Sequence, residues 1–273
     1  MRDVTIVIVT FNTRQELEAC LASIAAAPPT TPHRVVVVDN ASSDGTPGAV
    51  ARNWPAVRLI ASDRNVGFAA GNNRAIREAD SEFVLLLNSD TLVRAGAVDA
   101  LVQALGADPG AAAAGPRLVG ADGRPEISFG KMMGPLNELR QKVLGRLYDR
   151  GVPAAVAWVR RMTSRRQRPD WVSGACLLVR RADALAAGLL DERYFLYAED
   201  VDFCAALRAL GRHIVFVPEA EVVHVRGASG RQRPEATEAA YRRSQLAFYE
   251  KHHPAWAPLL KAYLRLRGVG PAP

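Results

Sequence analysis

The chain has 273 residues, of which 49% are hydrophobic and 23% charged, and its formal net charge is +7. This composition is typical of an ordinary globular protein and points neither to disorder nor to a membrane span. No apolar stretch reaches the roughly 18 residues of a transmembrane helix, and the N-terminus reads as a strand rather than a signal peptide. The three cysteines, Cys20, Cys176 and Cys204, are odd in number and widely spaced, which favours reduced core residues in a cytoplasmic protein.

The positive charge is concentrated in two segments. Residues 131–168 contain ten Lys or Arg and two acidic residues, a net of +8, and residues 224–267 carry a further +6. Localised positive charge predicts an anionic partner near these segments. Nucleic acid is not the expected partner, because the first segment has few aromatic residues and no recognisable binding motif.

The first part of the chain alternates strand and helix patterns, which predicts βαβ units and a parallel sheet. Two continuous apolar runs, Val35–Val38 and Phe83–Leu87, are typical of strands buried on both faces. We predict strands over residues 4–10, 34–39, 57–61, 83–88 and 111–118, and helices over residues 13–27, 47–53, 67–79 and 96–105.

Residues 124–168 interrupt this alternation. Apolar residues recur there at helical spacing with basic residues between them, which predicts an amphipathic basic helix, and a second helix is expected over 154–162. The apolar positions are Leu136, Leu139, Val143, Leu144 and Leu147. Two interpretations stay open: a solvated surface helix, or a surface that docks to an anionic membrane or a lipid-diphosphate acceptor.

Regular patterns return after residue 168. We predict strands over 171–180, 214–217 and 221–225, helices over 182–187 and 201–210, and a mostly helical tail over 235–266 that is interrupted near Pro254 and Pro258. The expected organisation is an α/β half (1–118), a second half (119–230) that includes the basic insertion 131–168, and a C-terminal helical tail (231–273).

Polar motifs follow the predicted strands, at the edge where parallel sheets bind ligands. Asp39 ends one buried strand and opens the run Asp39–Thr46, whose residues also close turns through their side chains. Asn65–Asn73 carries two glycines at a strand-to-helix turn, where backbone N–H groups can face a ligand. Each motif also has a plain structural interpretation as a turn.

Together, five motifs resemble those of family 2 glycosyltransferases of the GT-A fold, over roughly residues 4–230. They are Thr10–Asn12, Asp39–Thr46, Asn65–Asn73, Leu87–Asp90 and Tyr197–Asp202. Within that family the chain looks most like the bacterial branch that includes rhamnosyltransferases of cell-wall and O-antigen assembly. The resemblance implies an α/β fold with a Rossmann-like mixed central sheet flanked by helices, a helical acceptor-side insertion and C-terminal helices. It also implies that residues 1–118 are the nucleotide-sugar-binding half and residues 119–230 the acceptor-binding and catalytic half.

The resemblance also implies roles for the donor-side residues. Asp39 would accept the imide N–H of uracil or thymine. The other expected nucleotide and donor contacts are Thr10, Asn12, Asp63, Arg64, Asn65, Gly67, Asn72, Asn88 and Ser89. Thr10 could equally begin the following helix.

Asn88-Ser89-Asp90 stands where the family carries Asp-x-Asp, so Asp90 would bind a divalent cation, Mg²⁺ or Mn²⁺, on the substrate diphosphate. The first position is Asn here, which reduces the motif and puts metal affinity in doubt. His224 would complete the metal or diphosphate site, although a lone histidine between valines also suits a core.

Asp200 matches the family position of the general base that deprotonates the acceptor hydroxyl, and Glu199 is the alternative. Acids also favour a helix start for electrostatic reasons. We expect Phe203, Leu207 and Leu210 to face the core, which would turn the carboxylates outward.

Four further residues are expected at the acceptor and diphosphate. Asp170 and Trp171 would lie near the donor sugar and acceptor, although Trp171 also suits a core. Arg226 and Ser229 would contact the diphosphate.

The expected protein is thus a metal-dependent, inverting glycosyltransferase that uses a dTDP-sugar, with rhamnose as first candidate, or a UDP-sugar. Its acceptor would be a glycan or a lipid-linked saccharide, at the inner face of the cell membrane. The helical tail could support a homodimer. Alternatives are a sugar nucleotidyltransferase, whose glycine-rich basic first loop is missing, and a non-catalytic module that binds a sugar nucleotide or anionic polymer. A nicotinamide-dependent dehydrogenase lacks its Gly-x-Gly-x-x-Gly motif.

Overall fold

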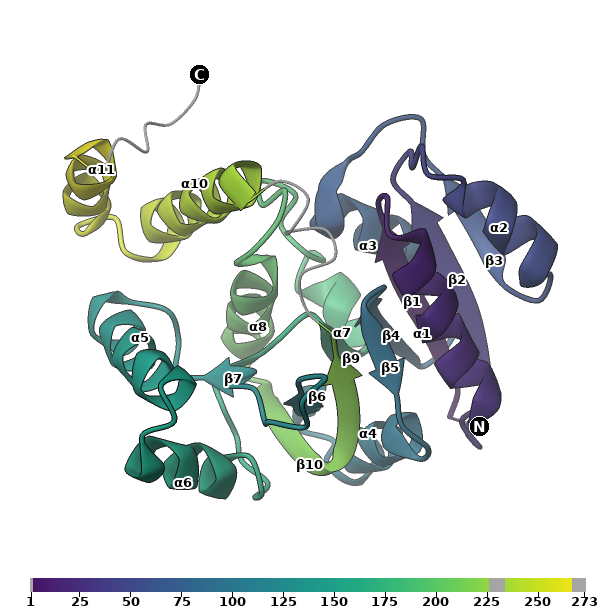
Figure 1. The fold of residues 1–273 in the computed structure, drawn as a ribbon, viewed down its shortest axis with the longest axis horizontal. Coiled ribbons are helices and arrows are strands. Elements are labelled where there is room, and N and C mark those ends of the chain that lie inside the picture. Colours follow the sequence, from purple (N-terminus) through teal and green to yellow (C-terminus); the bar gives the residue numbers. More distant parts are fainter. Residues whose placement is uncertain (1, 226–233, 267–273) are drawn as a thin grey trace.

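The computed structural model describes residues 2–225 and 234–266, which form a mixed sheet with helices on both faces (Figure 1). The strands are β1 (Val4–Thr10), β2 (His33–Asp39), β3 (Arg58–Ala61), β4 (Phe83–Asn88), β5 (Thr91–Val93), β6 (Ala111–Val119), β7 (Phe129–Gly130), β8 (Trp171–Val172), β9 (Cys176–Arg180) and β10 (His213–His224). The helices are α1 (Arg14–Ala26), α2 (Thr46–Asn53), α3 (Gly67–Glu78), α4 (Ala97–Ala107), α5 (Pro135–Asp149), α6 (Pro153–Met162), α7 (Arg181–Ala186), α8 (Glu199–Ala209), α10 (Pro234–His252) and α11 (Ala257–Leu266).

The main sheet has eight strands in the order β3-β2-β1-β4-β9-β6-β10-β5. β1 runs parallel to β2 and β4, and β9 runs antiparallel to β4 and β6. The register places Thr10 opposite Asp39 and Val9 opposite Asn88. The predicted donor-side residues therefore meet at one edge of the sheet, because parallel strands end on the same side.

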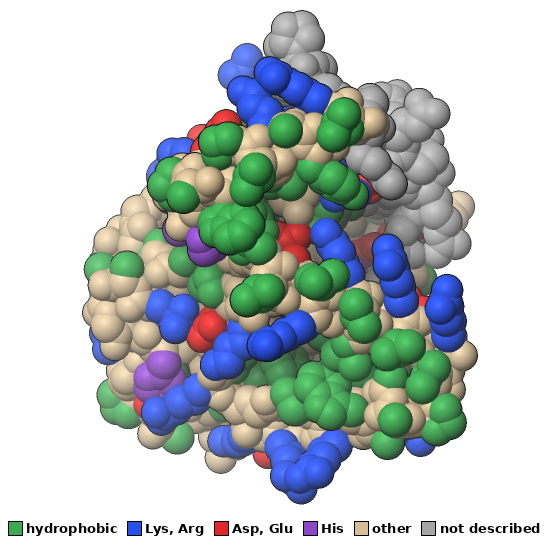
Figure 2. All heavy atoms as spheres, turned by 90° about the vertical axis from the view of Figure 1, so that its left-hand side faces the viewer, with side chains coloured by type: hydrophobic (Ala, Val, Ile, Leu, Met, Phe, Trp, Pro, Cys, Tyr) green, Lys and Arg blue, Asp and Glu red, His purple; other side chains and the backbone are tan. Residues whose placement is uncertain are grey.

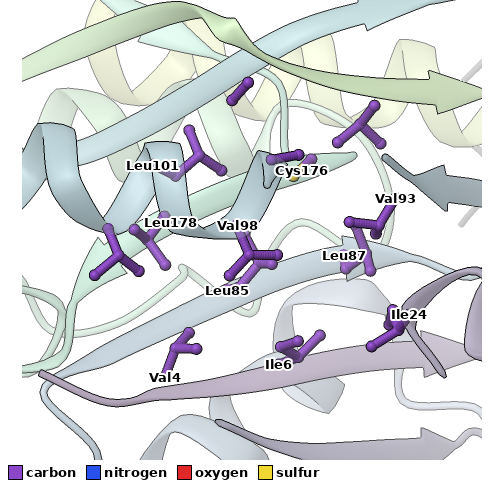
Figure 3. Packing of buried hydrophobic residues seen from close by; sticks show 14 of the residues in the cluster. Val4, Ile6, Ile24, Leu85, Leu87, Val93, Val98, Leu101, Cys176 and Leu178 are labelled. Carbon is purple, nitrogen blue, oxygen red and sulfur yellow. The ribbon is translucent and has the colours of Figure 1, made fainter. Parts of the chain in front are cut away.

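The two faces of the sheet are covered by separate apolar layers. Alternate residues of β1 enter opposite layers: Ile6 packs with α1 and α4, and Val7 packs with α3 and α8. Figure 3 shows the first layer, in which Leu85 of β4 and Val98 of α4 lie near Ile6. The strands predicted to be buried on both faces are confirmed, and the three cysteines are free and buried as expected.

Three predicted strands differ from the structure. The strand expected over 171–180 is broken at residues 173–175, because β8 pairs with β7 whereas β9 joins the main sheet. The strands expected over 214–217 and 221–225 are one strand, β10, whose pairing with β6 shifts between Val217 and Glu221. Leu210 was expected in the core, but it lies at the end of α8 and is 46% exposed.

Helices α5, α6, α10 and α11 lie on the same side of the molecule, at the left of Figure 1. α5 and α6 pack on each other through Tyr148 and Val159, and α10 packs near the start of α8 through Phe248 and Tyr249. The predicted interruption of the tail lies between α10 and α11, and Pro258 falls inside the first turn of α11 rather than before it.

Candidate active site

Asp39 ends β2 and is 1% exposed. Its Oδ2 atom accepts a hydrogen bond from the Ser42 N–H at 2.9 Å. Its Oδ1 atom is buried and has no hydrogen-bond partner within the described ranges. Because a buried carboxylate oxygen without a donor is costly, this atom marks a place where a ligand N–H would be favourable. Asp39 therefore both closes a turn and presents an acceptor.

Asn12 holds the loop that follows Asp39. Its backbone is left-handed, with φ of 54°, a conformation that Asn tolerates better than most residues. Its Oδ1 accepts the Ser43 N–H at 2.8 Å, and its own N–H donates to Ser42 Oγ at 2.9 Å. In this structure Asn12 shapes the edge of the donor side through the loop.

Thr10 and Ser89 are buried and joined through Thr13, whose hydroxyl lies 2.9 Å from each of theirs. These hydroxyls tie the end of β1 to the residues after β4. Asp63 and Arg64 lie exposed in the loop after β3, where their side chains are accessible.

The glycine motif is shaped by local packing. Gly67 has a φ of +85°, and a Cβ atom there would lie 2.5 Å from the Phe195 carbonyl oxygen, so only glycine fits. Asn65 Oδ1 accepts the Gly67 N–H at 2.9 Å. Asn72 donates to the Phe68 carbonyl, and its own Oδ1 is buried without a partner among the described residues. The motif brings α3 against the loop that leads into α8.

A pocket of about 410 Å³ lies beside the end of β4, between α5, α8, α10 and the end of β10. Five predicted site residues line it although they are far apart in sequence: Asn88, Trp171, Glu199, Asp200 and His224. The pocket thus unites Asn88, the first residue of the reduced metal motif, with the late histidine and the two candidate bases.

Asp200 opens into this pocket from the first turn of α8. Its Oδ2 accepts the Gly174 N–H at 2.7 Å, and its Oδ1 accepts the Val201 N–H at 2.8 Å. Burial raises the pKa of Asp200 above its ordinary value, and these backbone hydrogen bonds oppose the shift. A fixed carboxylate with a raised pKa suits a general base.

Glu199 and Asp202 do not face outward as expected. Glu199 is 5% exposed, and burial followed by the charge of Asp200 raises its pKa well above the ordinary value. Asp202 is 2% exposed and accepts hydrogen bonds from Lys251 at 2.8 Å and His252 at 2.6 Å. The outward expectation was wrong because α10 covers this side of α8.

His224 lies between two carboxylates. Its Nε2 is 3.4 Å from Asp90 Oδ1, and its Nδ1 is 3.2 Å from Glu126 Oε2. Burial lowers the pKa of His224, but the hydrogen bonds and charges of Asp90 and Glu126 outweigh this and raise it to about 9. The structure thus brings the two predicted cation ligands together.

Asp90 and His224 are the candidate ligands of a metal site. The part of the chain that the structure describes contains no group of three or more His, Cys, Asp or Glu able to hold a metal ion. In this structure both ring nitrogens of His224 pair with carboxylates, so a cation would have to replace the proton between Nε2 and Asp90 in order to bind both side chains, and a nucleotide diphosphate would supply further oxygens. This donor set fits a divalent cation that is bound jointly with substrate.

Trp171 lines the pocket, and its indole N–H donates to the Lys131 carbonyl at 2.9 Å. Asp170 does not line the pocket: it accepts the Met132 N–H at 2.9 Å and pairs with Arg208 at 3.1 Å. Its contacts in the structure therefore position the segment before Trp171. Arg226 and Ser229 lie outside the described residues.

Comparison with known proteins identifies the family. Residues 5–166 match the model described as "Glycosyl transferase family 2". The chain belongs to glycosyltransferase family 2. This glycosyltransferase is 35% identical to the N-acetylglucosaminyl-diphospho-decaprenol L-rhamnosyltransferase of Mycobacterium tuberculosis, an alignment that covers 96% of this chain and 90% of that protein.

Solved structures show the GT-A fold. The mannosyltransferase PcManGT of Pyrobaculum calidifontis, in complex with GDP-Man and Mn²⁺, is 23% identical with a TM-score of 0.64, over 95% of this chain and 68% of that one. GalNAc-T7 with UDP, GalNAc and Mn²⁺ has a TM-score of 0.64 at 16% identity, over 90% of this chain and 48% of that one. The predicted α/β fold and the transferase interpretation are confirmed. Among the described helices, none has the length and apolarity required to cross a bilayer.

Three residues of the site, Glu126, Tyr241 and Glu138, escaped the sequence interpretation, and Tyr197 belonged to a recognised motif without an assigned role. Glu126 contacts His224, Tyr197 and Tyr241 line the pocket with ring centroids 5.9 Å apart, and Glu138 lines it from α5. Glu126 lies in a segment without regular pattern, so nothing in the sequence pointed to it. Glu138 was detectable in principle, as one of two acids within a strongly basic segment.

Proposed function

We propose that this glycosyltransferase moves a sugar, with rhamnose as first candidate, from a dTDP- or UDP-sugar to a hydroxyl of a lipid-linked saccharide during cell-envelope polysaccharide assembly. The observation that carries the proposal is the placement of Asp200 in the same pocket as His224, whose Nε2 lies 3.4 Å from Asp90 Oδ1. The extended similarity to a rhamnosyltransferase whose name specifies a lipid-linked N-acetylglucosamine supports the choice of donor sugar and acceptor.

The chemistry is a single displacement with inversion. Asp200 takes the proton from the acceptor hydroxyl while the oxygen attacks the anomeric carbon. The bond from that carbon to the donor diphosphate breaks, and its electron pair leaves with the nucleoside diphosphate. Asp200 suits this role because its carboxylate is fixed by two backbone N–H groups and its ionised form is destabilised by burial.

The other residues bind and orient the substrates. The unpartnered Oδ1 of Asp39 accepts the imide N–H of the base. Asp90 and His224 would hold Mg²⁺ or Mn²⁺, which supplies charge stabilisation for the diphosphate leaving group. Tyr241 and Trp171 offer aromatic faces against which a sugar ring of the acceptor packs.

The protein would act as a peripheral enzyme at the cytoplasmic face of the membrane. Leu136 and Leu139 of α5 are 70% and 60% exposed, and they lie in the segment with a net charge of +8. Exposed apolar side chains among basic residues favour contact with an anionic membrane surface. Binding to vesicles of anionic rather than neutral lipid checks this contact.

The transfer itself is tested with purified protein, Mn²⁺ or Mg²⁺, dTDP-rhamnose or UDP-sugars, and N-acetylglucosamine linked by a diphosphate to a lipid. We expect one donor class to give product with inverted anomeric configuration, assigned by NMR. Retained configuration would contradict the single displacement. Donor hydrolysis without any transfer would contradict the acceptor class.

A further inference from the structure

A second cavity, of about 700 Å³, lies between α5 and α6 next to the active-site pocket. Gln141 of α5 lines both cavities, and Trp171 of the active-site pocket donates a hydrogen bond to Lys131, which lines the second one. The two cavities are therefore neighbours on the same helix, α5.

The interior of the second cavity is apolar. The apolar side chains that line it include Ile127, Phe129, Leu144, Trp158, Val159 and Met162. Trp158 is 46% exposed, so one wall of the groove opens to the surface. A concave apolar surface of this size is typical of a site for an apolar ligand.

The rim of the cavity is positively charged. Lys131, Arg140 and Arg168 line it. Arg140 has neither a hydrogen bond nor an ion pair with any other residue in the described ranges, and the closest acidic oxygen to Lys131, that of Asp170, is 4.0 Å away. Guanidinium and ammonium groups in this setting are well suited to phosphate oxygens.

We infer that this groove binds the hydrocarbon chain of a prenyl-diphosphate-linked acceptor, with Lys131 and Arg140 at the diphosphate and the saccharide in the neighbouring pocket beside Asp200. This inference rests on the proposed lipid-linked acceptor. The order chain, diphosphate, saccharide follows the order apolar groove, basic rim, active-site pocket.

The surrounding surface agrees with this occupant. The face that bears α5, α6 and α11 shows hydrophobic side chains interspersed with Lys and Arg (Figure 2). Leu259 of α11 and Trp256 just before this helix are 62% and 51% exposed. Such a face would place the groove at a membrane surface, from which a lipid chain enters. A second copy of the protein fits less well, because its own basic segment would meet this one with like charge.

The test is calorimetric titration of geranylgeranyl diphosphate, inorganic diphosphate and geranylgeraniol into the full chain. Trp158→Ala removes a groove side chain that is already half-exposed, and Leu139→Ala removes an exposed side chain of α5 that lines neither cavity. We expect Trp158→Ala to weaken geranylgeranyl diphosphate about tenfold or more and to leave inorganic diphosphate unchanged. Leu139→Ala should stay within about twofold of the parent.

Arg140→Ala provides a second variant on an exposed position. It should weaken geranylgeranyl diphosphate about tenfold and leave geranylgeraniol unchanged. Equal affinity of parent, Trp158→Ala and Arg140→Ala for geranylgeranyl diphosphate would overturn the inference. A second result would also overturn it: the parent sediments as a dimer, Trp158→Ala sediments as a monomer, and both bind geranylgeranyl diphosphate equally.

A transfer assay separates this inference from the proposed function. Transfer to N-acetylglucosamine carried on a short, water-soluble alkyl diphosphate tests the function alone, and Trp158→Ala should not change its KM. With a long prenyl chain on the same acceptor, Trp158→Ala should raise the KM about tenfold. If the short acceptor reacts but Trp158→Ala leaves the KM for the long-chain acceptor unchanged, the assignment of the groove is contradicted and the proposed function is not. If neither acceptor reacts but prenyl binding depends on Trp158, the function is wrong.

Discussion

The two sides of the active site are built differently. Around β1, β2 and β4, polar side chains are buried or half-buried and many of them accept backbone N–H groups, as the half-buried Asn12 and Asn65 do. On the side of α5, α6 and α11, large apolar residues such as Leu136 and Trp158 are exposed, and basic side chains such as Arg140 are unpaired in the described parts of the chain. The sheet side thus resembles a preformed nucleotide site, whereas the helical side resembles a surface that binds a partner.

The largest effect is expected where the two sides meet, at Asp200. Asp200→Asn should lower the transfer rate about 10²–10⁴-fold, because the general base is lost. Binding of the nucleoside diphosphate should not change, since Asp39 and Asp90 remain. Calorimetry of nucleotide binding beside a transfer assay checks both statements. A transfer rate equal to that of the parent would exclude Asp200 as the base.

The raised pKa of Asp200 predicts a pH dependence of the transfer rate. Burial raises the pKa of Asp200, so its ionised, basic form is lost as the pH falls through that raised value. The transfer rate should therefore fall on the acidic side at a higher pH than an ordinary aspartate would give. Glu199, the neighbouring acid, stays protonated over a wider range because its pKa is raised further. A Glu199→Gln variant that keeps the acidic limb of the parent would assign that limb to Asp200.

On the sheet side, the next effect is expected at Glu126, which contacts His224. Glu126→Gln removes the carboxylate that holds His224 Nδ1 at 3.2 Å, so the Mn²⁺ concentration for half-maximal activity should rise about 10–100-fold. Glu221→Gln is a suitable control, because this acid pairs with Arg94 at the other side of β10. An unchanged Mn²⁺ requirement in Glu126→Gln would remove Glu126 from the site.

A glycine substitution on each side compares how tightly the two sides are packed. Gly67→Ala should destabilise the protein by about 1–3 kcal/mol for the left-handed backbone and about 1–3 kcal/mol for the overlap with Phe195. Gly145→Ala in α5, where a Cβ atom meets nothing within 4 Å, should stabilise it by up to about 1 kcal/mol. Denaturant unfolding measures both. Equal destabilisation by the two substitutions would show that the helical side is packed as tightly as the sheet side.

A modest loss of stability is expected at Glu138, which joins α5 to α10. Its carboxylate accepts hydrogen bonds from Gln245 at 2.6 Å and Tyr249 at 2.7 Å. Glu138→Gln should cost about 1–2 kcal/mol, because an amide replaces a charged acceptor of two donors. Thermal unfolding of Glu138→Gln beside Glu250→Gln, an exposed acid of α10, checks this. A Tm equal to that of the control would mean that α10 is held without this contact.

The sheet side was largely predictable from sequence, whereas the helical side was not. Continuous apolar runs that end in Asp39 and Asn88 identify parallel strands and the sheet edge that they share. Such runs, and the alternation of strand and helix patterns around them, are local properties of the sequence. The partners of Glu138 and Asp202 are helices distant in sequence, and only packing brings α10 over α8. Local periodicity therefore predicted that helices 5 and 10 exist but not that their side chains would line the pocket.

The most direct test of this division is the set of KM values of Asp39→Asn and Tyr241→Ala for donor and acceptor. In Asp39→Asn one amide atom must still accept the Ser42 N–H, so the NH₂ group faces the base N–H, and the donor KM should rise about 10–100-fold while the acceptor KM stays constant. Tyr241→Ala removes an aromatic wall of the pocket and should raise only the acceptor KM, by about tenfold. If either variant raised both KM values alike, donor and acceptor would not occupy separate sides of the site.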